Sequence, residues 1–209
     1  MESSEKKGLL IAFEGVDGAG KTTQAREVCA ALAERGVDAV YLREPTNGPH
    51  GTRLRQLMVA GRDKVDPMEE FRLFLEDRRE DVAQNISPAL ARGAVVCIDR
   101  YYISSMAYQG ALGLDPEFIR VENEKIAPVP DLILYFHLPV EESHARIVAT
   151  REGGYNLFEQ QAYQERVAAV FDGMNFPQMV KIDAARDPAA VQQQVMAEIE
   201  KLLTSHSLV

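Results

Sequence analysis

Five short apolar runs occur along the chain, and each has the length of a β-strand. They are rich in Val, Ile, Leu and aromatic residues and occupy residues 9–13, 38–42, 94–98, 132–138 and 179–182. Within each run the apolar residues are nearly continuous rather than alternating with polar ones. This pattern is typical of parallel strands that are buried on both faces of a sheet.

The segments between these runs have helical spacing. In "TTQAREVCAALAERG" (22–36), Val28 and Leu32 lie four residues apart, and Gly36 is placed to end the helix. Strand and helix alternate, which predicts an α/β fold with helices on both faces of a parallel sheet and ligands beyond the carboxyl ends of the strands. No repeat, linker or shift in composition marks a second domain, so we expect a single domain over residues 1–209.

Composition narrows the possible partners. The chain has 209 residues, 46% of them hydrophobic, and a formal net charge of -9. An acidic protein lacks the basic face that nucleic acid or an anionic membrane requires, so any phosphate site must be local. Cys29 lies in a helical pattern and Cys97 inside an apolar run, where we expect a small buried residue; neither a disulfide nor a metal role is expected. We find no signal sequence and no apolar stretch of membrane-spanning length, which favours a cytoplasmic protein.

The stretch "GVDGAGKTT" (15–23) carries the clearest chemistry. Residues 15–22 match the pattern G-x-x-x-x-G-K-[ST], directly after a predicted strand and before a predicted helix. In such a loop the backbone N–H groups surround the β-phosphate of a nucleotide, while the lysine reaches the β- and γ-phosphates and the hydroxyl binds Mg²⁺. The alternative is a glycine-rich turn that happens to contain lysine, which this context disfavours. The predicted nucleotide-binding residues are Gly15, Val16, Asp17, Gly18, Ala19, Gly20, Lys21, Thr22 and Thr23.

Two further stretches suggest a second ligand. In "DRYYISSMAYQG" (99–110), Asp99 ends a buried strand and is placed to hold Mg²⁺ together with Thr22, with Arg100 beside it. Phe74 and Arg78 are four apart and share a helix face, which offers one planar ligand a stacking surface and a fork of donors. A core Phe with a surface Arg is the alternative interpretation. The sequence lacks the N-K-x-D stretch of a small GTPase, which leaves a small kinase as the leading hypothesis.

The order and spacing of several stretches resemble the thymidylate kinase family, whose members transfer the γ-phosphoryl group of ATP to dTMP. The resemblance extends from about residue 8 to residue 185 and implies a P-loop fold with a five-stranded parallel sheet, Mg²⁺, a homodimer and a place in dTTP synthesis. The stretches that carry it are "FEGVDGAGKTTQ", "REP", "LFLEDR", "DRYYISSMAYQG" and "PDLILYF".

The resemblance implies roles for individual residues. Phe74 matches an aromatic that stacks on thymine, Arg78 an arginine that hydrogen-bonds a carbonyl oxygen of the base, and Tyr108 a tyrosine below the deoxyribose. Arg55 and Arg100 match arginines that hold the acceptor phosphate. The same pocket is implied to contain Asp17, which meets the 3′-hydroxyl of the sugar, and Ser104, Ser105 and Gln109.

Members of the family bring one further positive charge to the transferred phosphoryl group. It comes either from an arginine in the P-loop or from arginines in a mobile flap, the LID. Gly18 and Ala19 occupy the P-loop positions, so we expect the LID, about residues 146–158, to supply it through Arg146 and Arg151. These two arginines, with Lys21, Asp17 and Arg100, form the predicted catalytic set. The alternative is that both flap arginines lie on a helix surface without a role in transfer.

Two other functions remain open on the sequence. A kinase of the same fold could act on dUMP or UMP, because the small side chain of Ser105 leaves the choice of base looser. A nucleotide-dependent switch with little turnover is the alternative from a different class, since the flap is poor in arginine.

Overall fold

The structure is a computed structural model that describes residues 8–60, 65–150 and 157–206. Its centre is a five-stranded sheet, in the order β2-β3-β1-β4-β5, in which every neighbouring pair is parallel. The predicted α/β fold is confirmed, and all five predicted strands are present. Their bounds are β1 (Leu9–Gly15), β2 (Ala39–Arg43), β3 (Val95–Asp99), β4 (Leu132–His137) and β5 (Met179–Asp183).

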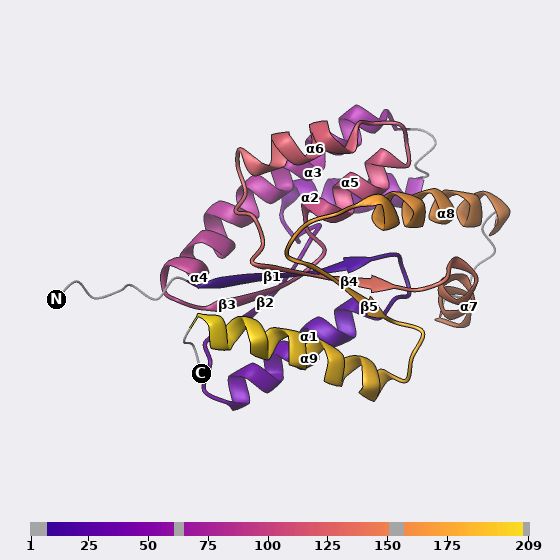
Figure 1. The fold of residues 1–209 in the computed structure, drawn as a ribbon. Helices are drawn as coiled ribbons and strands as arrows, with labels where there is room; N and C mark the ends of the chain where they lie inside the picture. Colours follow the sequence, from indigo (N-terminus) through magenta and orange to yellow (C-terminus); the bar gives the residue numbers. More distant parts are fainter. Residues whose placement is uncertain (1–7, 61–64, 151–156, 207–209) are drawn as a thin grey trace.

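Helices cover both faces of this sheet (Figure 1). One face carries α1 (Lys21–Glu34) and α9 (Pro188–Ser205), and the other carries α3 (Pro67–Asp81), α5 (Tyr102–Gly110) and α8 (Leu157–Gly173). The remaining helical segments are α2 (Pro49–Ala60), a π-helical turn (Val82–Ile86), α4 (Ser87–Ala91), α6 (Pro116–Glu124) and α7 (Val140–Thr150). The carboxyl end of β4 leads directly into α7, so the side of the molecule near α7 is the side where ligands are expected.

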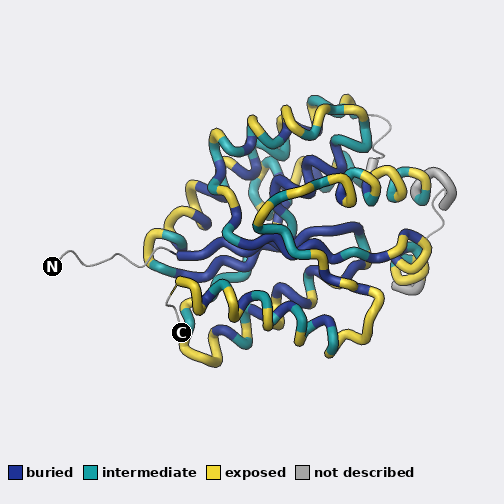
Figure 2. The backbone as a smooth tube through the Cα atoms, viewed as in Figure 1, coloured by how far each residue is buried: buried dark blue, intermediate teal, exposed yellow. Residues whose placement is uncertain are grey.

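The core lies along the central strands (Figure 2). Every residue of β1 and β3 is buried, and β4 is buried except for His137. β1 pairs with β3 on one side and β4 on the other, so that Ile11 lies opposite both Cys97 and Leu132. Cys97 is fully buried, as predicted, whereas Cys29 on α1 is only partly buried; both are free thiols.

Three helices on the surface begin with the same aspartate–proline signal. Asp66, Asp115 and Asp187 precede α3, α6 and α9, and each side chain accepts a backbone N–H of the first turn. Each such cap stabilises its helix by about 1 kcal/mol. α1 is different, because its N-cap is Gly20 and no side chain caps it. The first N–H groups of α1 therefore stay available for another acceptor.

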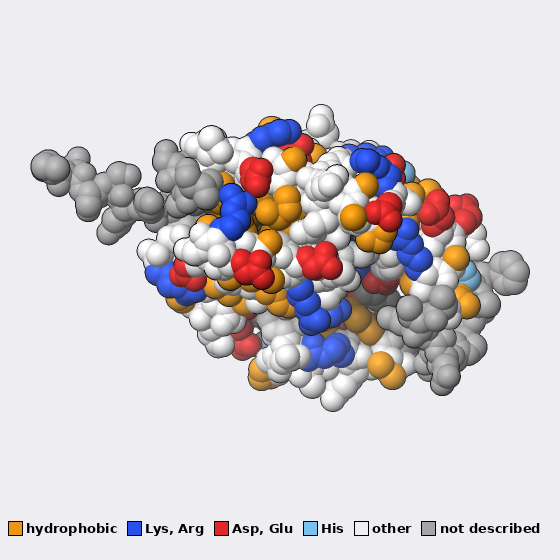
Figure 3. Space-filling view, turned by 90° about the horizontal axis from the view of Figure 1, so that it is seen from below, with side chains coloured by type: hydrophobic (Ala, Val, Ile, Leu, Met, Phe, Trp, Pro, Cys, Tyr) orange, Lys and Arg blue, Asp and Glu red, His pale blue; other side chains and the backbone are white. Residues whose placement is uncertain are grey.

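The surface is not organised as a basic face on the side that α1 and α9 cover. Figure 3 shows that side, with Lys and Arg side chains interspersed among Asp and Glu. No described helix combines the length and apolar character needed to cross a membrane.

Candidate active site

The phosphate loop joins β1 to α1 and depends on its glycines. Gly15, Gly18 and Gly20 have φ values of 139°, 77° and 87°, which favour glycine. A Cβ at Gly15 would also lie 2.4 Å from the carbonyl oxygen of Phe136 on β4. The sequence pattern predicted this turn between a strand and a helix, and the structure has it.

Lys21 follows the loop and is only 5% exposed. Its Nζ donates to the carbonyl oxygen of Val16 at 2.6 Å. Burial lowers the pKa of Lys21 to about 7, with the nearby charge of Arg100 adding to the effect and Asp17, Asp99 and Glu14 opposing it. Among the described residues, the carbonyl oxygen of Val16 is the one hydrogen-bond partner of the Lys21 ammonium. A bound anion would favour the charged form of this buried group, so the site suits an anionic ligand.

Thr22 and Asp99 meet at the start of α1 and the end of β3. The Thr22 hydroxyl donates to Asp99 Oδ2 at 2.5 Å, and the Tyr41 hydroxyl donates to the same oxygen at 3.3 Å. The other oxygen, Asp99 Oδ1, is buried without a hydrogen-bond partner among the described residues. A hydroxyl and a carboxylate with a spare buried oxygen suit a hard divalent cation such as Mg²⁺. Within the described segments no group of three or more His, Cys, Asp or Glu side chains could hold a metal ion, so phosphate and water oxygens would complete such a site.

Arg100 joins the phosphate loop to α5. Its Nη2 donates to Asp17 Oδ1 at 2.6 Å and to the Tyr108 hydroxyl at 3.2 Å, and its guanidinium lies 5.0 Å from the centre of the Tyr108 ring. Its Nη1 donates to Ser104 Oγ at 3.2 Å. The structure thus brings together four residues that the sequence assigned to one pocket.

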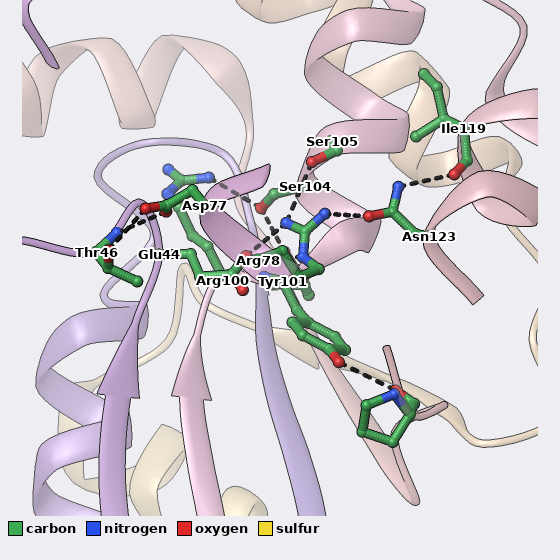
Figure 4. A network of polar contacts seen from close by, with 12 residues as sticks. Glu44, Thr46, Asp77, Arg78, Arg100, Tyr101, Ser104, Ser105, Ile119 and Asn123 are labelled. Atoms are coloured by element: carbon green, nitrogen blue, oxygen red, sulfur yellow. Dashed lines mark hydrogen bonds and ion pairs between the residues drawn. The ribbon is translucent and has the colours of Figure 1, made fainter. Parts of the chain in front are cut away.

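Arg78 is 1% exposed and lies inside a polar network (Figure 4). Its Nε and Nη2 donate to Glu44 Oε2 at 2.9 and 2.5 Å, its Nη1 donates to Asn123 Oδ1, and its Nη2 reaches Ser105 Oγ at 3.3 Å. Its guanidinium also lies 5.2 Å from the centre of the Tyr101 ring. The alternative interpretation of Arg78 as a surface arginine is therefore wrong. A buried guanidinium held on three sides can present a remaining N–H in a fixed direction.

Glu44 and Asn123 both accept hydrogen bonds from Arg78. Burial raises the pKa of Glu44 to about 8, although the charge of Arg78 opposes the shift. Asn123, on α6, accepts from Arg78 and donates through Nδ2 to the Ile119 carbonyl oxygen at 2.7 Å. We did not predict a role for Asn123. Its only signal is a polar residue four positions after Ile119, on the buried face of an otherwise exposed helix.

Arg55, on α2, contacts the loop that follows β2. Its Nη1 donates to the carbonyl oxygens of Thr46 and Pro45 at 2.6 and 3.1 Å. Thr46 is itself anchored to Asp77 of α3 by two hydrogen bonds, from its N–H at 2.8 Å and its hydroxyl at 2.6 Å. The structure therefore anchors the Arg55 guanidinium to backbone oxygens of the loop that follows β2.

Gln109 and Phe74 lie on the two helices that bound the pocket. Gln109 is fully buried on α5, and neither its Oε1 nor its Nε2 has a partner among the described residues. An unpaired buried amide costs about 1–3 kcal/mol, which a bound polar group could recover. Phe74 is half-buried on α3, one helical turn before Arg78.

The predicted LID is only partly visible. Arg146, on α7, donates from Nη2 to the Ala184 carbonyl oxygen at 3.0 Å and from Nη1 to the Gly18 carbonyl oxygen at 3.5 Å. It therefore lies beside the phosphate loop. Arg151 lies outside the described residues. From α8, Gln164 Nε2 reaches Asp17 Oδ2 at 3.4 Å, a contact that the sequence did not indicate.

A parallel α/β sheet with a phosphate loop after its first strand, a buried aspartate after its third and a second polar pocket beside them defines a P-loop protein that binds nucleoside triphosphates. Comparison with known proteins agrees: residues 13–195 match the family model described as thymidylate kinase. The chain belongs to the thymidylate kinase family.

Proteins called thymidylate kinase are similar to this chain over most of its length. One from Desulfotalea psychrophila is 43% identical over 200 residues, which cover 96% of this chain and 98% of that protein. Another from Akkermansia muciniphila is 45% identical over 202 residues, covering 97% and 94%. A third, from Xanthomonas campestris pv. campestris, is 46% identical over 192 residues, covering 92% and 83%.

Proposed function

We propose that this enzyme transfers the γ-phosphoryl group of ATP to dTMP and forms ADP and dTDP, which supplies dTTP synthesis in the cytoplasm. The observation that carries the proposal is that α5 joins the phosphate loop to the buried Arg78 pocket in a chain of the thymidylate kinase family: Arg100 contacts Asp17 of the loop and Ser104, and the neighbouring Ser105 contacts Arg78. A related kinase for dUMP or UMP, or a switch with little turnover, is not favoured by this membership.

The donor side is built from the phosphate loop. The free N–H groups at the start of α1 and the ammonium of Lys21 would bind the β- and γ-phosphates. Thr22 and Asp99 would hold Mg²⁺, whose charge would help to neutralise the phosphate oxygens. Transfer between two anionic phosphates needs positioned cations more than it needs a general base, because the acceptor is already an anion.

The acceptor side is built from α3 and α5. Arg78, held by Glu44 and Asn123, would donate to the base, with Phe74 stacked on it. Arg100 would hold the acceptor phosphate, beside the carboxylate of Asp17 that is proposed to meet the sugar. Arg55 would hold the same phosphate from α2. The remaining lining residues are Ser104, Ser105, Tyr108 and Gln109.

Two parts of the proposal concern motion and assembly. Arg151, with Arg146, would bring the last positive charge to the transferred group when the LID closes over the donor. A homodimer would form through the long helix that bears Phe74, α3, and a helix after the third strand. Of the two helices that follow this strand, α5 is buried inside the chain, whereas α6 exposes Phe118 and Val121.

The decisive experiment is ADP release with ATP and Mg²⁺, offering dTMP, dUMP, UMP, dCMP and AMP singly. We expect kcat/KM for dTMP to exceed that for each other acceptor by at least about tenfold. In the same assay Arg151→Ala should lower kcat about 10²-fold or more, with KM for dTMP changed by less than about threefold, because its contact forms mainly in the transition state.

Arg92→Ala is the matched control. Arg92 is exposed, pairs with Asp38 and lies before β3, at the opposite end of the sheet. It should turn over like the wild type. Equal turnover with several monophosphates would replace the proposal with a broader pyrimidine kinase, and binding of both nucleotides without ADP release would replace it with a switch.

A further inference from the structure

Arg100 has an unusual backbone. It is the one non-glycine residue with positive φ in the described part of the chain, at 68°. Such a conformation costs on the order of 1–3 kcal/mol and persists only where neighbours hold it. Here the neighbours are both on β1: the Arg100 N–H donates to the Phe13 carbonyl oxygen at 3.1 Å, and the Tyr101 N–H donates to Glu14 Oε1 at 2.7 Å.

Glu14 also reaches the Arg100 side chain through Ser104. The Ser104 hydroxyl donates to Glu14 Oε2 at 2.5 Å and accepts from Arg100 Nη1 at 3.2 Å. A serine hydroxyl has one proton, and a guanidinium cannot accept a hydrogen bond. With Glu14 ionised, the proton of Ser104 therefore points to Glu14, and a lone pair of its oxygen points to Arg100.

We propose that Glu14 is a positioning residue for the acceptor phosphate, because it holds the backbone turn at Arg100 through Tyr101 and the guanidinium through Ser104. Glu14 is fully buried, so it acts without touching the substrate. Ser104 is then a link in this chain rather than a direct contact of the nucleotide. The inference rests on the proposed function, because it takes Arg100 as the ligand of the dTMP phosphate.

A purely structural glutamate would support the sheet and leave ligand selectivity unchanged. The distinguishing readout is a comparison of dTMP with thymidine, which has the same base and sugar but no phosphate. In Glu14→Gln the amide oxygen can still accept from Tyr101, while the amide N–H₂ donates to Ser104. The Ser104 proton is then left facing Arg100, which has no acceptor for it.

The experiment is calorimetric titration of wild type and variants with dTMP and with thymidine at about pH 8, where a glutamate is expected to be ionised. For Glu14→Gln we expect Kd for dTMP to rise about tenfold to hundredfold, with Kd for thymidine within about twofold of wild type. Ser104→Ala should weaken dTMP binding in the same selective way. The double variant should be no weaker than Glu14→Gln by more than about twofold, since both changes break one chain.

Controls separate the possible failures. Glu198→Gln removes one carboxylate from α9, where it pairs with Lys201, and should bind both ligands like wild type. Circular dichroism and an unchanged Kd for ATP show that each variant is folded, and if Glu14→Gln does not fold, Ser104→Ala carries the same comparison.

Equal weakening of dTMP and thymidine, no weakening of either, or additive effects in the double variant would overturn the inference and leave the proposed function standing. A wild-type protein that binds neither ligand would instead overturn the proposed function.

Discussion

Several ionisable side chains are buried at the carboxyl end of the sheet. Lys21, Glu14, Glu44 and Arg78 are each at most 5% exposed. Burial raises the pKa of Glu14 to about 7 and that of Glu44 to about 8, and it lowers the pKa of Lys21 to about 7. Groups with such displaced pKa values are typical of sites that bind or transfer charge, because the ligand supplies what the protein interior lacks.

Phe74 should serve the acceptor alone. Phe74→Ala is expected to raise KM for dTMP about tenfold to hundredfold, because stacking of a base on an aromatic ring contributes about 1–3 kcal/mol. KM for ATP should change by less than about twofold, and Phe74→Tyr should restore most of the loss because it keeps the ring. Steady-state kinetics with each nucleotide varied in turn measure both values. Equal losses for the two nucleotides would mean that Phe74 does not line the acceptor pocket.

Stability should depend on pH through Glu14. Its pKa of about 7 in the folded protein, against 4.5 normally, arises because burial outweighs the opposing effects of Ser104, Arg100, the Tyr101 N–H and Lys21. Tyr135 of β4 lies opposite Glu14 in the sheet. Because burial raises the pKa of Glu14, the folded state binds the proton of the Glu14 carboxyl more tightly than the unfolded chain does. The contribution of the protonated Glu14 carboxyl to the free energy of unfolding is fully present below pH 4.5 and is lost as the pH rises through about 7.

Urea unfolding at several pH values tests this dependence. The free energy of unfolding of the wild type, taken relative to Glu14→Gln, should fall between about pH 5 and about pH 8. The other titrating groups are the same in both proteins, so their contributions largely cancel in the difference. A difference that stays constant, or that grows with pH, would contradict a raised pKa for Glu14.

At the scale of elements, α6 contributes to a pocket that other helices line. Its buried face carries Ile119 and Asn123, and through Asn123 it holds Arg78, which lies on α3. The opposite face carries the exposed Phe118 and Val121. One short helix therefore carries both the exposed apolar face and the side chain that holds Arg78. A contact that shifts α6 from its exposed face can thus shift the guanidinium that is proposed to recognise the base.

Asn123→Leu tests this support. The substitution keeps the number and branching of the side-chain heavy atoms but leaves a buried N–H of Arg78 without its acceptor, at a cost of about 1–3 kcal/mol in the free energy of unfolding. KM for dTMP should rise about tenfold if the guanidinium loses its fixed direction, while KM for ATP stays close to wild type. Asn175→Leu, in the exposed loop before β5, is the control for adding an apolar side chain. Loss of stability with unchanged KM for dTMP would show that Asn123 has only a packing role.

At the scale of the whole molecule, a net charge of -9 coexists with a site that must attract two nucleotides. The structure reconciles these facts by placing Lys21, the first residue of α1, and Arg100, which follows β3, beside the phosphate loop, together with the uncapped start of α1. Attraction of phosphate is then a property of the carboxyl ends of the central strands, where burial strengthens each charge, while the chain as a whole keeps its negative net charge.

The proposed homodimer gives a prediction at this scale. Val121→Glu places a charge in the middle of the exposed apolar face of α6 and should convert a dimer into a monomer, measured by sedimentation equilibrium. Val148→Glu is the control, because Val148 is 50% exposed and lies on α7, which follows β4. The wild-type protein sedimenting as a monomer, or a dimer that survives Val121→Glu, would contradict an interface on α6.

The sequence by itself determined the parts of this protein that consecutive residues build. Five apolar runs specified the strands, because a strand buried on both faces needs an unbroken apolar segment. The phosphate loop was equally readable, since the glycines, Lys21 and Thr22 act within a single strand–turn–helix unit. Phe74 and Arg78 could be placed on one helix face because their spacing is one turn.

Only the tertiary structure decided how the pocket is held together. Glu14 and Ser104 are 90 positions apart, and Arg78 and Asn123 are 45 apart. Their pairing depends on the strand order and on how α3, α5 and α6 pack. In the sequence Glu14 is one polar residue at the end of an apolar run, and Asn123 is one in a polar helix. A buried charge is stable only with its partners, and those partners come from elements that the fold alone brings together.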